Sequence, residues 1–157
     1  MPATVAHRLR ELGITLPEVA APVAAYVPAV RTGNQVWTSG QLPFVGGVLE
    51  VTGLVGDGEG TVRPDVAAGL ARTAALNALA AVAELAGSLD RVRRVVKVVG
   101  FVASAPGFTG QPAVVNGASE LLGQVFGEAG VHARSAVGVA ALPLGSPVEI
   151  ELVVELS

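Results

Sequence analysis

The chain has 157 residues, a net charge of −3 and no cysteine, and 51% of its residues are hydrophobic while 15% are charged. This length suits one domain with a hydrophobic core, and the lack of cysteine excludes disulfides, thiolate nucleophiles and thiolate metal sites. The negative charge and the 4% of aromatic residues argue against a nucleic-acid-binding protein with a basic surface and stacking rings.

The first residues form an amphipathic segment of mixed charge, which predicts a short helix over residues 3–12. Val5, Leu9 and Leu12 make its apolar stripe, and Gly13 marks its end. The segment lacks the basic start and the apolar run of a secretory signal. No stretch of about 18 or more residues is expected to be apolar enough to span a bilayer. We therefore expect a cytoplasmic protein without a membrane partner.

Two short strands are expected next, over residues 24–31 and 35–39, after a proline-rich segment that stays extended. The intervening Thr32-Gly33-Asn34 suits a tight hairpin turn. Closely spaced glycines then predict a loop over residues 41–63, with a small ribbon at 48–52.

The second half of the chain predicts two long helices and three strands. The first helix is expected from Pro64 to about residue 86, since proline suits the first turn of a helix. Residues 95–103 have the composition of a buried strand. A second helix is expected over about 112–127, and two further strands over 134–141 and 148–156.

The predicted order is helix, strand, strand, helix, strand, helix, strand, strand. An α+β domain with one mixed sheet and two long helices packed on one face satisfies this order. In the last strand Ile150, Leu152 and Val154 alternate with Glu149, Glu151 and Glu155. The helices are expected to cover the apolar side. The opposite sheet face would then carry small and apolar residues with carboxylates, which calls for a partner subunit.

Arg134 stands at the entrance to an otherwise apolar strand, fifteen positions before Glu149. An unpaired guanidinium is costly to desolvate, so this side chain needs a partner. The partner is either a carboxylate of the protein, Glu149 or Glu151, or a carboxylate of a substrate. Spacing alone leans toward a structural pair across a subunit interface.

The order of elements and several local strings resemble the reactive-intermediate deaminase family (RidA, also called YjgF). The likeness covers about residues 22–155, nearly the whole chain. Its most specific part is an Arg-Ser strand start followed by Leu-Pro and then Glu-x-Glu. The strings are Tyr26-Val27-Pro28-Ala29-Val30, Val36-Trp37-Thr38-Ser39-Gly40-Gln41-Leu42-Pro43, Asn77-Ala78-Leu79, Asn116, Phe126-Gly127, Ala133-Arg134-Ser135-Ala136-Val137, Leu142-Pro143 and Val148-Glu149-Ile150-Glu151.

The resemblance implies a chorismate-mutase-like fold and a homotrimer with active sites in the clefts between subunits. It also implies an activity, the hydrolysis of enamines and imines such as 2-aminoacrylate to 2-keto acids and ammonia, with no metal or organic cofactor.

The same resemblance assigns roles to residues. Arg134 would hold the carboxylate of the substrate through two parallel hydrogen bonds, and Glu149 would orient the attacking water or act as general base. The archetypes often carry a cysteine where this chain has Ala136, a carboxylate at Gly138 and an arginine at Ala141. The remaining expected substrate-binding residues are Tyr26, Ser39, Gly40, Asn116 and Ala136.

Several of these residues also have a purely structural interpretation. Tyr26 can be a half-buried packing residue, Asn116 a local polar contact of the helix and Ser39-Gly40 a strand end. His132, next to the arginine, is more typical of a structural histidine in a turn than of an acid or base. Two other functions stay open: a trimer that binds small carboxylates without turnover and, less favoured because of the charge, an endoribonuclease.

Overall fold

The computed structural model describes residues 3–19, 21–22 and 24–157. Its elements follow the predicted order of helices and strands. Short 3-10 helices η1 (Leu89–Arg91), η2 (Gly127–Gly130) and η3 (Pro143–Gly145) join some of them. The main elements are α1 (Val5–Glu11), β1 (Ala29–Thr32), β2 (Gln35–Thr38), α2 (Pro64–Ala86), β3 (Val92–Ala103), α3 (Gln111–Phe126), β4 (Ala133–Val139) and β5 (Val148–Leu156).

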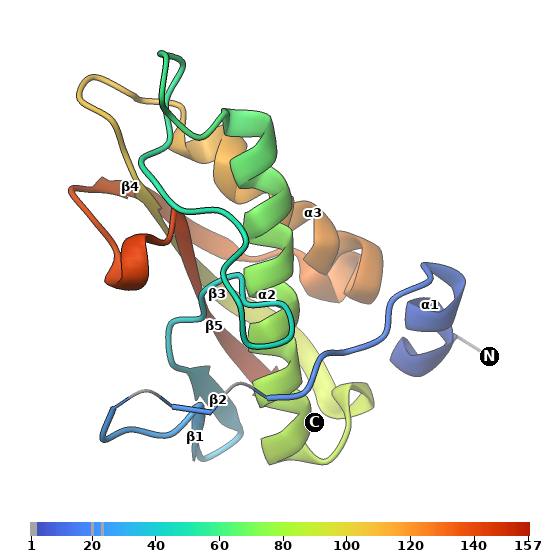
Figure 1. Cartoon of the computed structure of the whole chain (residues 1–157). Helices are drawn as coiled ribbons and strands as arrows, with labels where there is room; N and C mark the ends of the chain where they lie inside the picture. The colour runs from blue at the N-terminus through green and yellow to red at the C-terminus, as the bar shows by residue number, and fades with distance from the viewer. Residues whose placement is uncertain (1–2, 20, 23) are drawn as a thin grey trace.

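The five strands form one mixed sheet in the order β1-β2-β5-β3-β4. β4 runs parallel to β3, and the other neighbouring strands are antiparallel. Helices α2 and α3 pack on one face (Figure 1), and Ile150, Leu152 and Val154 of β5 are buried beneath them. The predicted α+β fold, with two long helices on the apolar face of the sheet, is therefore confirmed.

The hairpin between β1 and β2 is tighter than predicted. Thr32 pairs with Gln35, so only Gly33 and Asn34 form the loop. Gly33 has φ of 58°, and a type II′ hairpin turn places a glycine at that first central position. β1 starts at Ala29 and not at residue 24, because it follows Pro28, which has no N–H to donate to a strand ladder.

Two predictions for the connections need correction. No ribbon forms at 48–52 in the described chain; Val45 instead pairs with Val48 in an isolated bridge around a Gly-Gly turn. β3 begins three residues earlier than predicted, at Val92, because β5 is long enough to pair with it through Leu156.

Helix α2 is long and apolar enough, by length and composition alone, to cross a membrane. The expectation that no stretch would pass this test is therefore wrong. Its apolar character serves the core, because 56% of the apolar window is buried inside the protein. Gly117 of α3 lies so close to α2 that a Cβ there would overlap the carbonyl of Ala68, so small residues let the two helices touch.

The predicted N-terminal helix is confirmed as α1, which docks near the end of α3. Leu9 is buried, and Arg8 Nη1 donates to the carbonyl of Val125 at 3.3 Å. The backbone N–H of Val5 donates to Asp90 at 2.7 Å. From α1 the chain crosses α2 toward β1 (Figure 1), and this path brings its later residues next to Phe44 at the rim of a cavity.

Candidate functional site

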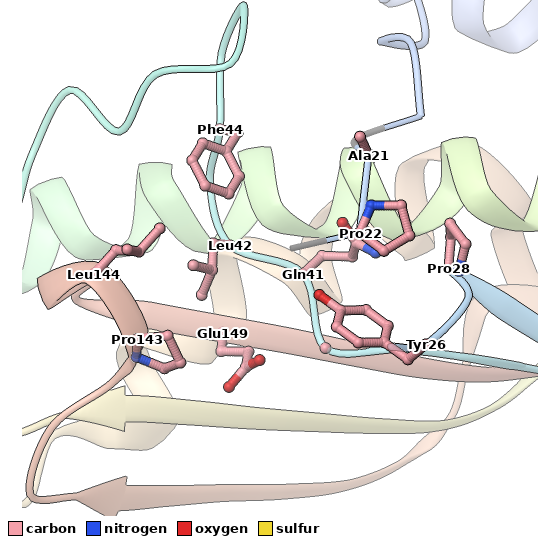
Figure 2. A pocket seen from close by; sticks show the side chains of 11 residues that line it. Ala21, Pro22, Tyr26, Pro28, Gln41, Leu42, Phe44, Pro143, Leu144 and Glu149 are labelled. Carbon is pink, nitrogen blue, oxygen red and sulfur yellow. The ribbon is translucent and has the colours of Figure 1, made fainter. Parts of the chain in front are cut away.

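A cavity of about 90 Å³ opens where three parts of the chain meet: the segment just before β1, the segment after β2, and the stretch from η3 to the start of β5. Tyr26 lies on one side of Glu149 in this cavity, and Pro143 and Leu144 lie on the other (Figure 2). The wall is mostly apolar. It is lined by Ala21, Pro22, Tyr26, Pro28, Gly40, Gln41, Leu42, Phe44, Pro143, Leu144 and Glu149.

Glu149 is held in place by the backbone next to it. Gln41 and Ile150 exchange two backbone hydrogen bonds of 2.8 and 3.0 Å, which lays Gly40 directly against the glutamate. A Cβ at position 40 would lie 2.7 Å from the carboxyl carbon of Glu149. A side chain at position 40 would therefore have to displace the carboxylate of Glu149.

The carboxyl group of Glu149 is easier to protonate than an ordinary one. Burial raises its pKa, and the neighbouring charge of Glu151 raises it further. In the described chain neither residue forms an ion pair, whereas Glu155 on the same strand face lies 3.9 Å from Arg93 and from Arg94. Glu149 is thus a carboxyl group able to give as well as take a proton next to a small cavity.

Tyr26 and Ser39 have different places at this site. Tyr26 lines the cavity and is 46% exposed. Ser39 does not line it: its hydroxyl donates to the carbonyl of Val27 at 2.6 Å, and its N–H donates to the carbonyl of Pro28 at 2.8 Å. Ser39 therefore fixes the segment that carries Tyr26.

Asn77 of α2 has a role that the sequence did not reveal. Its side chain is buried, and Nδ2 donates to the carbonyls of Leu42 at 2.9 Å and Phe44 at 3.1 Å. These two residues form part of the cavity wall. A polar residue on the buried stripe of an alanine-rich helix was the available signal, because such a group needs partners.

Leu144 also lines the cavity, and its backbone is strained. Its φ is 59°, which makes it the one non-glycine residue with positive φ among the described residues. The left-handed region is costly for a residue with a Cβ, and such strain clusters at functional sites. Leu144 is nevertheless 64% exposed, so burial of its side chain does not explain the conformation.

Arg134, the residue predicted to hold the substrate carboxylate, does not line this cavity. Arg134 Nη1 donates to Asn116 Oδ1 at 2.7 Å and to Ser119 Oγ at 3.3 Å, both on α3. Ala136, on the same face of β4, packs against the hydrophobic core. Arg134 forms no ion pair with Glu149 in the described chain, so the protomer itself does not provide that structural partner.

The predicted residues thus fall into two groups. One group holds Tyr26, Gly40 and Glu149 around the cavity, and the other holds Arg134 with Asn116 at the edge strand β4. Over residues 3–19, 21–22 and 24–157, no three His, Cys, Asp or Glu side chains gather as metal ligands would.

Comparison with known proteins gives consistent matches over nearly the whole chain. A family model described as "YjgF/chorismate mutase-like, putative endoribonuclease" matches residues 6–156. Protein TCP17 of Trypanosoma cruzi is 50% identical over 156 residues, which cover 98% of this chain and 94% of that protein.

Two solved structures extend the comparison. The protein Atu1372 of Agrobacterium tumefaciens, of unknown function, is 46% identical, with a TM-score of 0.87 over 98% of this chain and 92% of its own. RidA from an Antarctic Psychrobacter is 32% identical, with a TM-score of 0.60 over 88% of this chain and 94% of its own.

Proposed function

This chain belongs to the YjgF/chorismate mutase-like family, and we propose that it hydrolyses small carboxylate-bearing enamines and imines, of the 2-aminoacrylate type, to 2-keto acids and ammonia. The observation that carries the proposal is Glu149. Its carboxyl group has a raised pKa, makes no ion pair in the described chain and faces a small, mostly apolar cavity. Such a group suits proton transfer to and from a bound substrate.

The reaction consumes one water and moves a proton at each of its stages. Protonation of the enamine carbon gives the protonated imine, and water then adds to the imine carbon. The resulting carbinolamine loses ammonia and leaves the keto acid. In its ionised form Glu149 accepts a proton from the water, and in its protonated form it donates to the departing nitrogen. Burial raises the pKa of Glu149, so its protonated form is easier to reach than that of an ordinary carboxyl group.

Arg134 is proposed to bind the carboxylate of the substrate. Because Arg134 and Glu149 are separate within the protomer, we propose that a homotrimer brings them together, with one group from each of two neighbouring subunits. The uncovered face of the sheet supports this assembly. Trp37 and Val137 there are 53% and 44% exposed, and Val99, Phe101 and Val153 beside them are only half-buried.

The test is keto acid and ammonia release from imino acids generated in situ by an amino acid oxidase. Wild type should speed the decay of the imine over the spontaneous rate, and Glu149→Gln should lower that rate enhancement about 100-fold. Glu59→Gln, at an exposed glutamate in the loop before α2, is the matched control. Equal rates for wild type and Glu149→Gln would remove the role given to Glu149.

A second candidate is a protein that binds small carboxylates without turning them over. Its support is the surroundings of Arg134, since Ala136 and Gly138 on the same face of β4 offer no polar side chain. Stabilisation by 2-keto acids in a thermal shift, with no acceleration of imine hydrolysis, is the outcome expected for that function.

The endoribonuclease activity named for the family is the weakest candidate. A net charge of −3 offers little attraction to the phosphates of RNA. Binding of single-stranded RNA at low salt, where phosphate contacts are strongest, would revive it.

A further inference from the structure

A continuous chain of hydrogen bonds connects the backbone of η2 to the guanidinium of Arg134. His132 Nδ1 lies 2.6 Å from the carbonyl oxygen of Gly130, and His132 Nε2 lies 2.8 Å from Ser119 Oγ. Ser119 Oγ in turn accepts from Arg134 Nη1 at 3.3 Å. Asn116 Oδ1 accepts from the same nitrogen at 2.7 Å.

The direction of each bond follows from what each atom can donate. A carbonyl oxygen has no proton, so His132 Nδ1 must carry one and donate it to Gly130. In the neutral ring Nε2 is then bare, and it accepts the hydroxyl proton of Ser119. The lone pairs of the hydroxyl are left for Arg134. One backbone carbonyl thus sets the tautomer, the hydroxyl rotamer and the partner of the guanidinium.

These contacts use only one of the three guanidinium nitrogens. Both bonds from Arg134 go through Nη1, and in the described chain Nε and Nη2 have no hydrogen-bond partner. Nε and Nη2 form one edge of the rigid planar fork, and such an edge binds a carboxylate by two parallel N–H···O bonds. The contacts with α3 therefore fix the plane of the group and leave a carboxylate-binding edge open.

We infer that Ser119 and His132 are positioning residues that hold Arg134 so that its Nε–Nη2 edge receives the carboxylate of a 2-keto or 2-imino acid. The inference rests on the proposed function and specifies which part of the substrate this half of the site recognises. Esters and amides of the same acids lack the second anionic oxygen and are not expected to bind there.

A serine bonded to a histidine can also be a nucleophile, but the geometry here favours positioning. The Ser119 oxygen already accepts a hydrogen bond from a cation, which occupies one of its two lone pairs and makes the oxygen a weaker nucleophile. Ser119 also lies in the middle of α3 (Gln111–Phe126) and is only partly exposed. The nucleophilic serine of α/β-hydrolases, for comparison, sits on an exposed, sharp turn between a strand and a helix.

The test compares two substitutions of one residue. His132→Gln keeps a hydrogen-bond acceptor near Ser119, whereas His132→Leu removes it; Ser119→Ala removes the link from the other side. Pyruvate binding, measured by calorimetry, needs no turnover. We expect His132→Leu and Ser119→Ala to weaken it about tenfold and to raise KM in the imine assay similarly with kcat kept, while His132→Gln stays near wild type.

The control is Gln124→Ala, which removes an exposed hydrogen bond of the same helix to Arg72. Thermal unfolding of every variant shows whether the fold is kept. Wild-type pyruvate affinity in both His132→Leu and Ser119→Ala would overturn the inference, as would absence of pyruvate binding to the wild type. Covalent modification of Ser119 by phenylmethanesulfonyl fluoride would overturn it in favour of a nucleophile. Pyruvate binding without imine turnover would instead defeat only the deaminase proposal.

Discussion

Arg134 and Glu149 lie on opposite faces of one sheet. Arg134 is in register with Val98, and Val98 with the buried Leu152, on the side that α2 and α3 cover. Glu149 is in register with Phe101, three residues along β3 from Val98 and therefore on the other side. Within one chain the sheet therefore separates the two groups. If they act together, they act across an interface.

This arrangement makes a complementation experiment decisive for the proposed trimer. Arg134→Ala and Glu149→Gln subunits should each be inactive alone. Randomly mixed trimers would regain about one quarter of wild-type activity, because one site in four would combine an intact Arg134 with an intact Glu149. Co-expression with two different tags, followed by the imine assay, measures this. If verified mixed trimers recover no activity, then either both groups act within the site of one subunit or one of them takes no part in catalysis.

Gly40→Ala should impair the site more than the fold. The new methyl group would lie 2.7 Å from the carboxyl carbon of Glu149 and push that side chain away from the cavity. A displacement of about 1 Å can cost about 100-fold in rate, so we expect kcat to fall by about 10- to 100-fold. Gly58→Ala, where a Cβ meets nothing within 4 Å, is the control. Unchanged kinetics in Gly40→Ala would mean that the position of Glu149 is unimportant.

The raised pKa of Glu151 predicts the sign of a pH effect on stability. Burial raises that pKa in the folded chain, so the folded protein holds the proton more tightly than the unfolded one. The resulting stability is fully present below the ordinary carboxyl pKa and is lost as pH rises through the raised value. Glu151→Gln cannot ionise.

The difference between Glu151→Gln and wild type should therefore grow with pH over that window, with the variant the more stable at neutral pH. Urea unfolding at several pH values, at one protein concentration, measures it. A variant that gains nothing between acid and neutral pH would show that the ionised carboxylate is not penalised by burial.

The sequence predicted the buried side of β5 because strict alternation from Glu149 to Leu156 leaves only one way to face the core. It could not predict the surroundings of Arg134. Strand β4 is an edge strand, and its mixed exposure carries no comparable signal. The contact between Ser119 and Arg134 depends on where α3 crosses β4, which no local pattern records.

Asn77→Leu should destabilise the protein and loosen the cavity wall. The substitution leaves the carbonyl of Phe44 without its hydrogen-bond donor and removes one of the two from Leu42. A buried acceptor left unpaired costs about 1–3 kcal/mol; the bond to Phe44 is partly buried, so we expect a loss near the lower end of that range, which denaturant unfolding should detect. Gln124→Ala, at an exposed amide, should change the free energy of unfolding by about 0.5 kcal/mol or less. Similar free energies of unfolding for the two variants would show that Asn77 does not hold the segment that contains Leu42 and Phe44.

Leu144 allows strain and side-chain contacts to be separated with two substitutions. Leu144→Ala removes most of the side chain but keeps a Cβ at φ of 59°, whereas Leu144→Gly also relieves the left-handed backbone. Elsewhere glycine destabilises relative to alanine, since it has more freedom in the unfolded chain. Here we expect the reverse order, with the glycine variant more stable by about 1 kcal/mol.

Both Leu144 variants open the same side of the cavity, so they should share one change in KM while differing in stability. Thermal unfolding at a fixed protein concentration and the imine assay give the two readouts. If the alanine variant is the more stable, residue 144 leaves the left-handed conformation once leucine is replaced. The surrounding η3 then does not impose that conformation. If only the glycine variant changes KM, the backbone at position 144, and not its side chain, shapes the wall beside Glu149.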